Sequence, residues 1–260
     1  LRGRPLVEPI RVEVRDSPSP ARFEGFGGNF VYGLDSPVPT ALVERLSPVR
    51  ARLEMALHAW EPENDDDSPA TVNWDYFHSR DSEGSDLRRS FELAAFLSRR
   101  KIPIALAIWD LPEWMYEGAP AGRWASRRKI ASRQWPELLE SIETYLRHLK
   151  DRYEVEPDLL SFNEPDIGVR VLFSSEEHRE AIRKIGEHLT ARGFRTRLVL
   201  GDTASPRDTA SYGVYAVSDP VARRHLGAVS FHSWGGGTLA DFAAWQGLAR
   251  RVGLPLLIME

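Results

Sequence analysis

Apolar and polar positions follow two patterns along this chain, and together they predict repeated strand–helix units. Short apolar runs, typical of strands buried on both faces, occur at residues 49–57, 103–109, 159–162, 196–201, 228–232 and 255–259. Residues 23–30 predict an earlier strand that ends in glycines. Apolar residues at helical spacing predict helices at residues 38–46, 85–100, 134–153, 174–193, 212–224 and 239–251. This alternation predicts an α/β fold with a parallel sheet.

Polar or aromatic side chains follow nearly every predicted strand, and this feature favours a (β/α)8 TIM barrel. In such barrels the functional side chains stand at the C-terminal ends of the strands. The sequence contains neither a GxGxxG nor a GxxxxGK[ST] loop, so an open nucleotide-binding sheet is disfavoured.

The predicted barrel has seven strands, and the last is followed directly by Glu260. We therefore expect a barrel truncated after strand 7, within a longer protein, because an open barrel would leave two unpaired edges. Residues 10–15 alternate between apolar and polar, which predicts a half-exposed strand from a possible accessory β-domain. The expected division is an N-terminal strand and linker at 1–20 and an incomplete catalytic barrel at 21–260.

Composition disfavours some classes of partner, such as nucleic acids, and excludes reactions that need cysteine. A net charge of −4 gives no support for nucleic-acid binding, and no apolar run is long enough to span a membrane. The absence of cysteine excludes disulfides and thiolate chemistry but is compatible with cytosol or export. Residues 1–10 lack the apolar core of a signal peptide. We expect a secreted or extracytoplasmic protein whose signal peptide precedes this sequence.

Two glutamates follow apolar strands and suggest a reaction. Glu164 lies between Asn163 and Pro165, and the proline ends the strand because it cannot donate to a ladder. Glu260 follows the last apolar run. Two carboxyl groups at strand tips can cleave a glycosidic bond: one protonates the leaving oxygen, and the other attacks the anomeric carbon or activates water. Arg52 is a candidate cation for keeping the attacking carboxylate ionised.

The Asn163-Glu164-Pro165 motif resembles the fourth-strand signature of clan A glycoside hydrolases. Further matching features are the Gly-Phe-Gly-Gly segment at 25–28, Arg52, the strand that contains Trp109, and His232. With them, the whole chain resembles glycoside hydrolase family 30 and its relatives, which include glucosylceramidase, xylanase and β-1,6-glycanase types.

The resemblance implies a retaining double displacement on an oligo- or polysaccharide, with Glu164 as acid/base and Glu260 as nucleophile. It implies neither a cofactor nor a catalytic metal. The substrate-binding candidates, from the resemblance and from their places near strand ends, are Arg52, Asn163, Trp109, His232, Trp234, Asn29, Asp110 and Trp114. Two departures leave the sugar open: Asn29-Phe30-Val31 stands where the family often has an acid, and Ser233-Trp234 where it often has Trp-Tyr.

Other interpretations remain open. One is a glycan-binding barrel that kept the aromatic cleft but lost the reaction, and another is a metal-dependent barrel that uses Asp110, Glu164 and Asp202. The acidic run at 61–67 suggests calcium, but its spacing does not match an EF-hand, so we expect a solvated loop from which Asn64 and Asp65 reach the site. The sequence has no HExxH or GxSxG motif, which disfavours a zinc site and a serine hydrolase.

Overall fold

The computed structural model describes residues 22–31, 33–66, 68–122 and 125–260. Seven parallel strands form one sheet in sequence order. They are β1 (Gly28–Asn29), β2 (Ala51–Glu54), β3 (Ile104–Ile108), β4 (Leu159–Phe162), β5 (Arg197–Thr203), β6 (Leu226–Phe231) and β7 (Leu256–Ile258). The expected fold class is confirmed: the strands form a partial TIM barrel. The strand expected at residues 10–15 lies outside the described residues.

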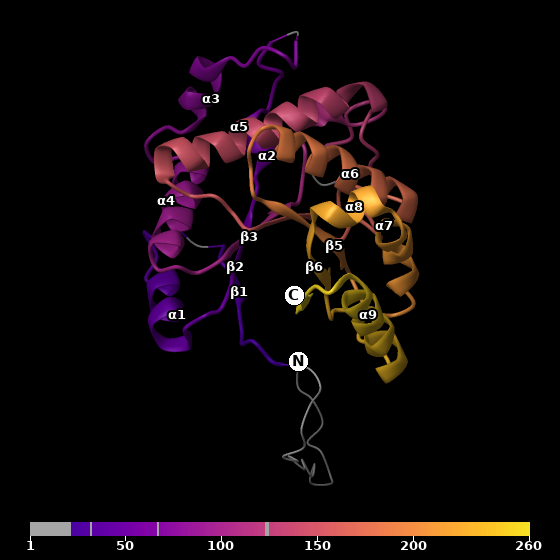
Figure 1. Cartoon of the computed structure of the whole chain (residues 1–260). Helices are drawn as coiled ribbons and strands as arrows, with labels where there is room; N and C mark the ends of the chain where they lie inside the picture. Colours follow the sequence, from indigo (N-terminus) through magenta and orange to yellow (C-terminus); the bar gives the residue numbers. More distant parts are fainter. Residues whose placement is uncertain (1–21, 32, 67, 123–124) are drawn as a thin grey trace, which may run out of the picture.

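The helices lie in an arc around the strands. They are α1 (Val38–Leu46), α2 (Leu57–Trp60), α3 (Trp74–Arg80), α4 (Asp86–Arg99), α5 (Trp135–Tyr153), α6 (Ser175–Ala191), α7 (Val214–Ser218), α8 (Pro220–His225) and α9 (Leu239–Val252). In Figure 1, α1 and α4 lie on the left, α5 and α6 run across the top, and α7 to α9 lie on the right. No helix in the described part of the chain is both long and apolar enough to cross a bilayer.

The helices depart from the sequence prediction in two places. The helix expected at 212–224 is divided into a 3-10 turn (Ala210–Gly213), α7 and α8. The break falls at Asp219, whose side chain caps α8 by accepting from the amide of Val221 at 2.8 Å, while Pro220 begins the new helix. Helices α2 and α3 were not predicted, because each is too short to show a period.

The interior of the barrel determines where polar groups fit. Near the N-terminal ends of the strands, Ala105, Leu159, Val199 and Ala228 form a small apolar cluster. Because side chains alternate along a strand, the next inward positions toward the C-terminal ends include Ser161, Gly201 and Ser230. These residues are small, so this end of the barrel has room for the larger charged side chains described below.

Candidate active site

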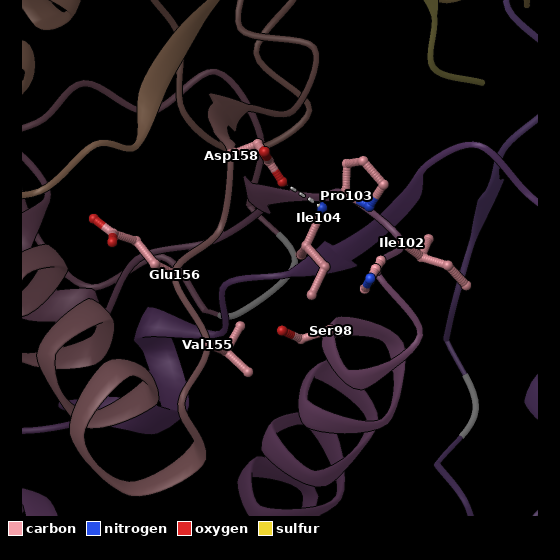
Figure 2. A pocket seen from close by; sticks show the side chains of 8 residues that line it. Ser98, Ile102, Pro103, Ile104, Val155, Glu156 and Asp158 are labelled. Atoms are coloured by element: carbon pink, nitrogen blue, oxygen red, sulfur yellow. Dashed lines mark hydrogen bonds between the residues drawn. The ribbon is translucent and has the colours of Figure 1, made fainter.

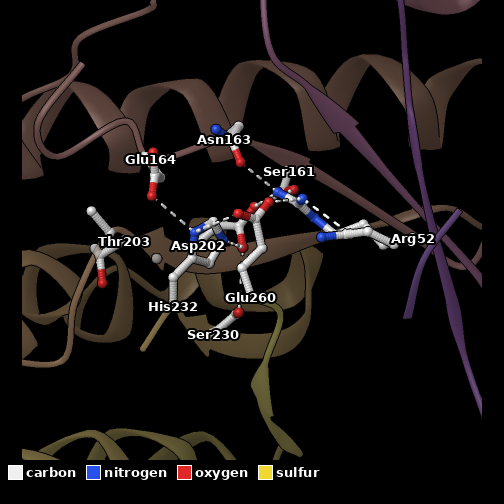
Figure 3. A network of polar contacts seen from close by, with 12 residues as sticks. Arg52, Ser161, Asn163, Glu164, Asp202, Thr203, Ser230, His232 and Glu260 are labelled. Atoms are coloured by element: carbon white, nitrogen blue, oxygen red, sulfur yellow. Dashed lines mark hydrogen bonds and ion pairs between the residues drawn. The ribbon is translucent and has the colours of Figure 1, made fainter. Parts of the chain in front are cut away.

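Polar side chains from five strands meet at the C-terminal end of the sheet, as the barrel prediction requires (Figure 3). The central members are Arg52 in β2, Asn163 and Glu164 after β4, Asp202 in β5, His232 after β6 and Glu260 after β7.

The backbone holds Glu164 in an uncommon conformation. Its φ is 45°, in the left-handed region that non-glycine residues rarely adopt. The Glu164 amide donates to the carbonyl of Asp202 at 3.0 Å, and the Glu164 carbonyl accepts from the amide of Gly168 at 3.0 Å. Such a conformation persists where the surrounding structure fixes it, and this is common at functional sites. The orientation of Glu164 therefore depends on β5 as well as on β4.

Arg52 connects four parts of the site through one buried guanidinium, which is 4% exposed. One terminal nitrogen donates to the carboxylate of Glu260 and, at 3.3 Å, to the side-chain oxygen of Asn29. The other donates to the side-chain oxygen of Asn163 at 2.7 Å and to Asp202 at 3.1 Å. The guanidinium centre also lies 5.7 Å from the ring centroid of Trp109. Arg52 thus supplies the charged partner of Glu260.

Asp202 is fully buried and contacts the two basic side chains of the site, Arg52 and His232. One carboxylate oxygen accepts from Arg52 at 3.1 Å and from the hydroxyl of Ser161 at 2.7 Å. The other lies 3.0 Å from Nε2 of His232 and 3.4 Å from the hydroxyl of Ser230. Burial alone would raise the pKa of Asp202, but the charge of Arg52 and the contacts with His232 and Ser161 outweigh it, so the pKa lies well below its ordinary value.

His232 joins Asp202 to Glu164. Its Nε2 faces Asp202, and its Nδ1 lies 3.1 Å from an oxygen of Glu164 and 3.7 Å from an oxygen of Glu260. Burial favours the neutral ring and lowers the pKa, but the hydrogen bonds to Asp202 and Glu164 and the charge of Asp202 raise it to about 9. A protonated ring donates from both nitrogens, so His232 can donate to Asp202 and to Glu164 at the same time.

The two predicted catalytic carboxylates lie close together. One oxygen of Glu164, one of Glu260 and a ring nitrogen of His232 are all within 4.8 Å of one another. The Glu260 oxygen that lies 3.7 Å from His232 also accepts from the indole Nε1 of Trp234 at 3.0 Å, whereas the other oxygen accepts from Arg52. These three atoms are also close enough to hold a metal ion. Protonated imidazole has no lone pair for a metal, so a metal ion here would have to displace the proton that Asp202 and Glu164 favour on His232.

Most of the predicted site residues meet in this network, but two do not. Asp110 accepts from the hydroxyl of Tyr116 at 2.6 Å, and Trp114 donates to the carbonyl of Glu61 at 3.1 Å, so both anchor the loop after β3. In the acidic loop, Asn64 donates to the carbonyl of Asp66 rather than to the site. The roles of the residues that do meet remain predictions.

Asp202 is the functional candidate that the glycosidase prediction missed. Its sequence signal is an acid directly after an apolar run, and this signal suggests only a possible metal ligand. Its inward direction depends on a bulge in β5, where Gly201 pairs with Ser230 and Thr203 with Phe231, so that Asp202 is the extra residue, with a φ of 55°.

A hollow of about 210 Å³ lies at the opposite end of the sheet (Figure 2). Its lining includes Ile104 at the start of β3 and Asp158 just before β4, and Asp158 accepts from the amide of Ile104 at 2.9 Å. Because barrel active sites lie at the C-terminal ends of the strands, where the carboxylate network is found, we do not assign this hollow to catalysis.

No sequence family and no curated protein matches this chain. Solved structures do match. SrfJ from Salmonella typhimurium superposes with a TM-score of 0.68 at 19% identity, over 92% of this chain and 56% of SrfJ. An endo-β-1,6-glucanase superposes with a TM-score of 0.66 at 16% identity, over 92% of this chain and 57% of the enzyme. A family 30 subfamily 8 xylanase from Clostridium acetobutylicum superposes with a TM-score of 0.62 at 12% identity, over 89% of this chain and 53% of the xylanase.

The chain has a fold similar to that of family 30 and family 39 glycoside hydrolases. The resemblance expected from the sequence is therefore confirmed for the fold. The chain spans little more than half the length of these structures, so the activity of the whole protein is a matter for proposal.

Proposed function

We propose that this chain carries the catalytic centre of a retaining glycoside hydrolase that cleaves β-glycosidic bonds. The observation that supports this most is the separation of at most 4.8 Å between oxygens of Glu164 and Glu260. Retaining enzymes place their carboxyl groups about 5–5.5 Å apart, whereas inverting enzymes need about 6.5–9.5 Å to admit a water molecule.

The surroundings of each glutamate suit the role proposed for it. Glu260 accepts from Arg52 and Trp234, which stabilise the ionised form that attacks the anomeric carbon. Glu164 protonates the leaving oxygen and later takes a proton from the attacking water. When Glu164 has given its proton away, the His232 side chain at 3.1 Å stabilises the carboxylate.

The proposed substrate is an oligo- or polysaccharide. The ring of Trp109 lies beside Arg52 and that of Trp234 beside Glu260, and tryptophan rings pack well against the apolar faces of sugars. Trp234 is 71% exposed, so its ring is available for such stacking. Two of the structural relatives are named as a β-1,6-glucanase and a xylanase, which makes β-glucans and xylans the first substrates to test.

The configuration of the first product tests the proposal. NMR spectra recorded during hydrolysis of a β-linked oligosaccharide should show the β-anomer of the new reducing end first, with the α-anomer appearing later by mutarotation. Initial release of the α-anomer would mean inversion. Binding without turnover across a panel of glycosides would favour a glycan-binding barrel, and loss of turnover on chelation would favour metal-dependent hydrolysis.

We also expect Trp234→Phe to lower kcat/KM by about 3- to 10-fold. The substitution keeps an aromatic ring but removes the indole N–H that donates to Glu260. Hydrogen bonds to charged groups are worth about 1.5–3 kcal/mol when buried, and exposure of this ring places the effect at or below the lower end. Steady-state kinetics on one substrate measure it, and an unchanged kcat/KM would show that the hydrogen bond has no part in catalysis.

A further inference from the structure

The bulge in β5 holds both neighbouring strand ends through its backbone. The carbonyl of Asp202 accepts from the amide of Glu164 at 3.0 Å, and the carbonyl of Thr203 accepts from the amide of His232 at 2.6 Å. The segment that turns the Asp202 side chain inward therefore also fixes the backbone positions of Glu164 and His232.

The two carboxylate oxygens of Asp202 have different partners. Oδ2 accepts from Arg52 at 3.1 Å and from the hydroxyl of Ser161 at 2.7 Å. Oδ1 lies 3.0 Å from Nε2 of His232, whose other ring nitrogen lies 3.1 Å from Glu164. Through Oδ1, Asp202 reaches the proposed acid/base by way of a single intervening side chain.

Arg52 does not depend on Asp202 for its charge, because a guanidinium remains protonated in proteins whatever its partners are. Its terminal nitrogens also donate to the side chains of Asn29, Asn163 and Glu260. If Asp202 lost its charge, Arg52 would stay charged and would stay attached to the proposed nucleophile.

His232 does depend on Asp202. The ring is fully buried, and burial favours its neutral form. The charged groups of the described residues that face it are three carboxylates and a guanidinium, those of Asp202 on β5, Glu164 after β4, Glu260 after β7 and Arg52 on β2. Burial lowers the pKa of His232, but the contacts with the carboxylates, Asp202 first, raise it to about 9. Without the charge of Asp202, we expect a neutral ring at pH 7.5.

We propose that Asp202 is a positioning residue for proton transfer by Glu164 and that it acts through His232. This inference rests on the proposed function. In the first step the proton of Glu164 moves to the glycosidic oxygen, the bond from that oxygen to the anomeric carbon breaks, and Glu260 forms the new bond. The charged ring keeps its own proton and donates from Nδ1 to the carboxylate that Glu164 becomes. The contribution of Asp202 therefore appears only where the leaving group needs a proton.

Two aryl β-glycosides of one sugar that the wild-type chain cleaves distinguish this role from a structural one. 2,4-Dinitrophenolate departs without a proton, whereas unsubstituted phenolate needs one. At pH 7.5, Asp202→Asn should lower kcat/KM for the phenyl glycoside by about 10- to 100-fold, the range expected for a hydrogen bond to a charged group. The loss for the dinitrophenyl glycoside should be much smaller. At pH 5.5 the ring is charged in the variant as well, so most of the selective loss should disappear.

The charge of the ring can be measured without any assay of hydrolysis. In ¹⁵N NMR spectra, the His232 signals are identified by their absence in His232→Asn. They should report a protonated ring at pH 7.5 in the wild-type chain and a neutral ring in Asp202→Asn. If Asp202→Asn does not fold, His232→Asn tests the proposal, because it should show the same selective loss for the phenyl glycoside, without recovery at pH 5.5.

Ser161→Ala is the matched control. It removes a hydrogen bond from Oδ2 of Asp202, on the Arg52 side, and should change kcat/KM for both glycosides by the same factor. A selective loss in Ser161→Ala would overturn the proposed route through His232. An equal loss for both glycosides in a folded Asp202→Asn chain, or a neutral His232 ring in the wild-type chain at pH 7.5, would overturn the positioning role alone. Failure of the wild-type chain to cleave any aryl β-glycoside or β-linked oligosaccharide would overturn the proposed function, and the positioning role with it.

Discussion

Glu260→Gln is expected to abolish glycoside hydrolysis, with a loss larger than the roughly 10²- to 10⁴-fold that general acid–base catalysis contributes. Glutamine has nearly the same shape, but its amide cannot form the covalent glycosyl intermediate that the double displacement requires. Arg52 would also face a neutral group in place of its charged partner. The kcat of the variant on an aryl β-glycoside and on an oligosaccharide measures the loss.

Glu164→Gln should behave differently, and the contrast tests the two roles. An aryl leaving group of low pKa departs without a proton, so the first step should continue with such a substrate and the glycosyl-enzyme should accumulate. A burst of released phenol, followed by slow turnover, is therefore expected for Glu164→Gln but not for Glu260→Gln. Mass spectrometry of the trapped chain should find the sugar on Glu260.

Glu187→Gln on the exposed side of α6 serves as the matched control and should retain wild-type kinetics. Turnover near the wild-type value in either Glu260→Gln or Glu164→Gln would contradict the assignment of that residue. A burst in Glu260→Gln instead of Glu164→Gln would mean that the two roles are exchanged.

The sequence was sufficient for the fold and for the two glutamates. Strands such as β3, in which every residue is apolar and buried, show a pattern that needs no knowledge of their neighbours. Glu164 was identifiable because Pro165 must end a strand, and strand ends of a parallel barrel meet on one face. The meeting of the two glutamates on that face therefore follows from local signals, and their catalytic roles remain predictions.

Asp202 and Glu61 were less predictable, because their environments are made by distant segments. Asp202 is turned inward by a bulge whose register depends on pairing with β6. Glu61 is buried because α5, a helix far along the sequence, packs over it. The sequence around Glu61 is that of an ordinary acidic loop and gives no sign of this burial. Sequence periodicity reports which face of an element is apolar, but not which polar group another element will cover.

Asp202→Asn is expected to lower the free energy of unfolding by about 3–5 kcal/mol, the usual cost of removing one partner from a buried ion pair. Asp202 is fully buried, and its loss leaves Arg52 and His232 without their shared anion. Urea unfolding at pH 6 measures the change. Asp208→Asn, at an exposed position six residues further on, should alter stability by less than about 0.5 kcal/mol.

The pH dependence identifies the cause of that loss. His232 has a folded pKa of about 9 against an ordinary 6.5, so its contribution to stability is complete below pH 6.5 and disappears as pH rises through 9. Asp202, whose folded pKa lies below its ordinary 3.8, contributes above that value and loses its contribution as pH falls further. Wild-type stability should therefore decline between pH 6.5 and 9. In Asp202→Asn, His232 loses the partner that raises its pKa most, so this decline should become much shallower. An equally steep decline in the variant would show that Asp202 does not stabilise protonated His232. Glu164 would then be the carboxylate that raises the pKa of His232.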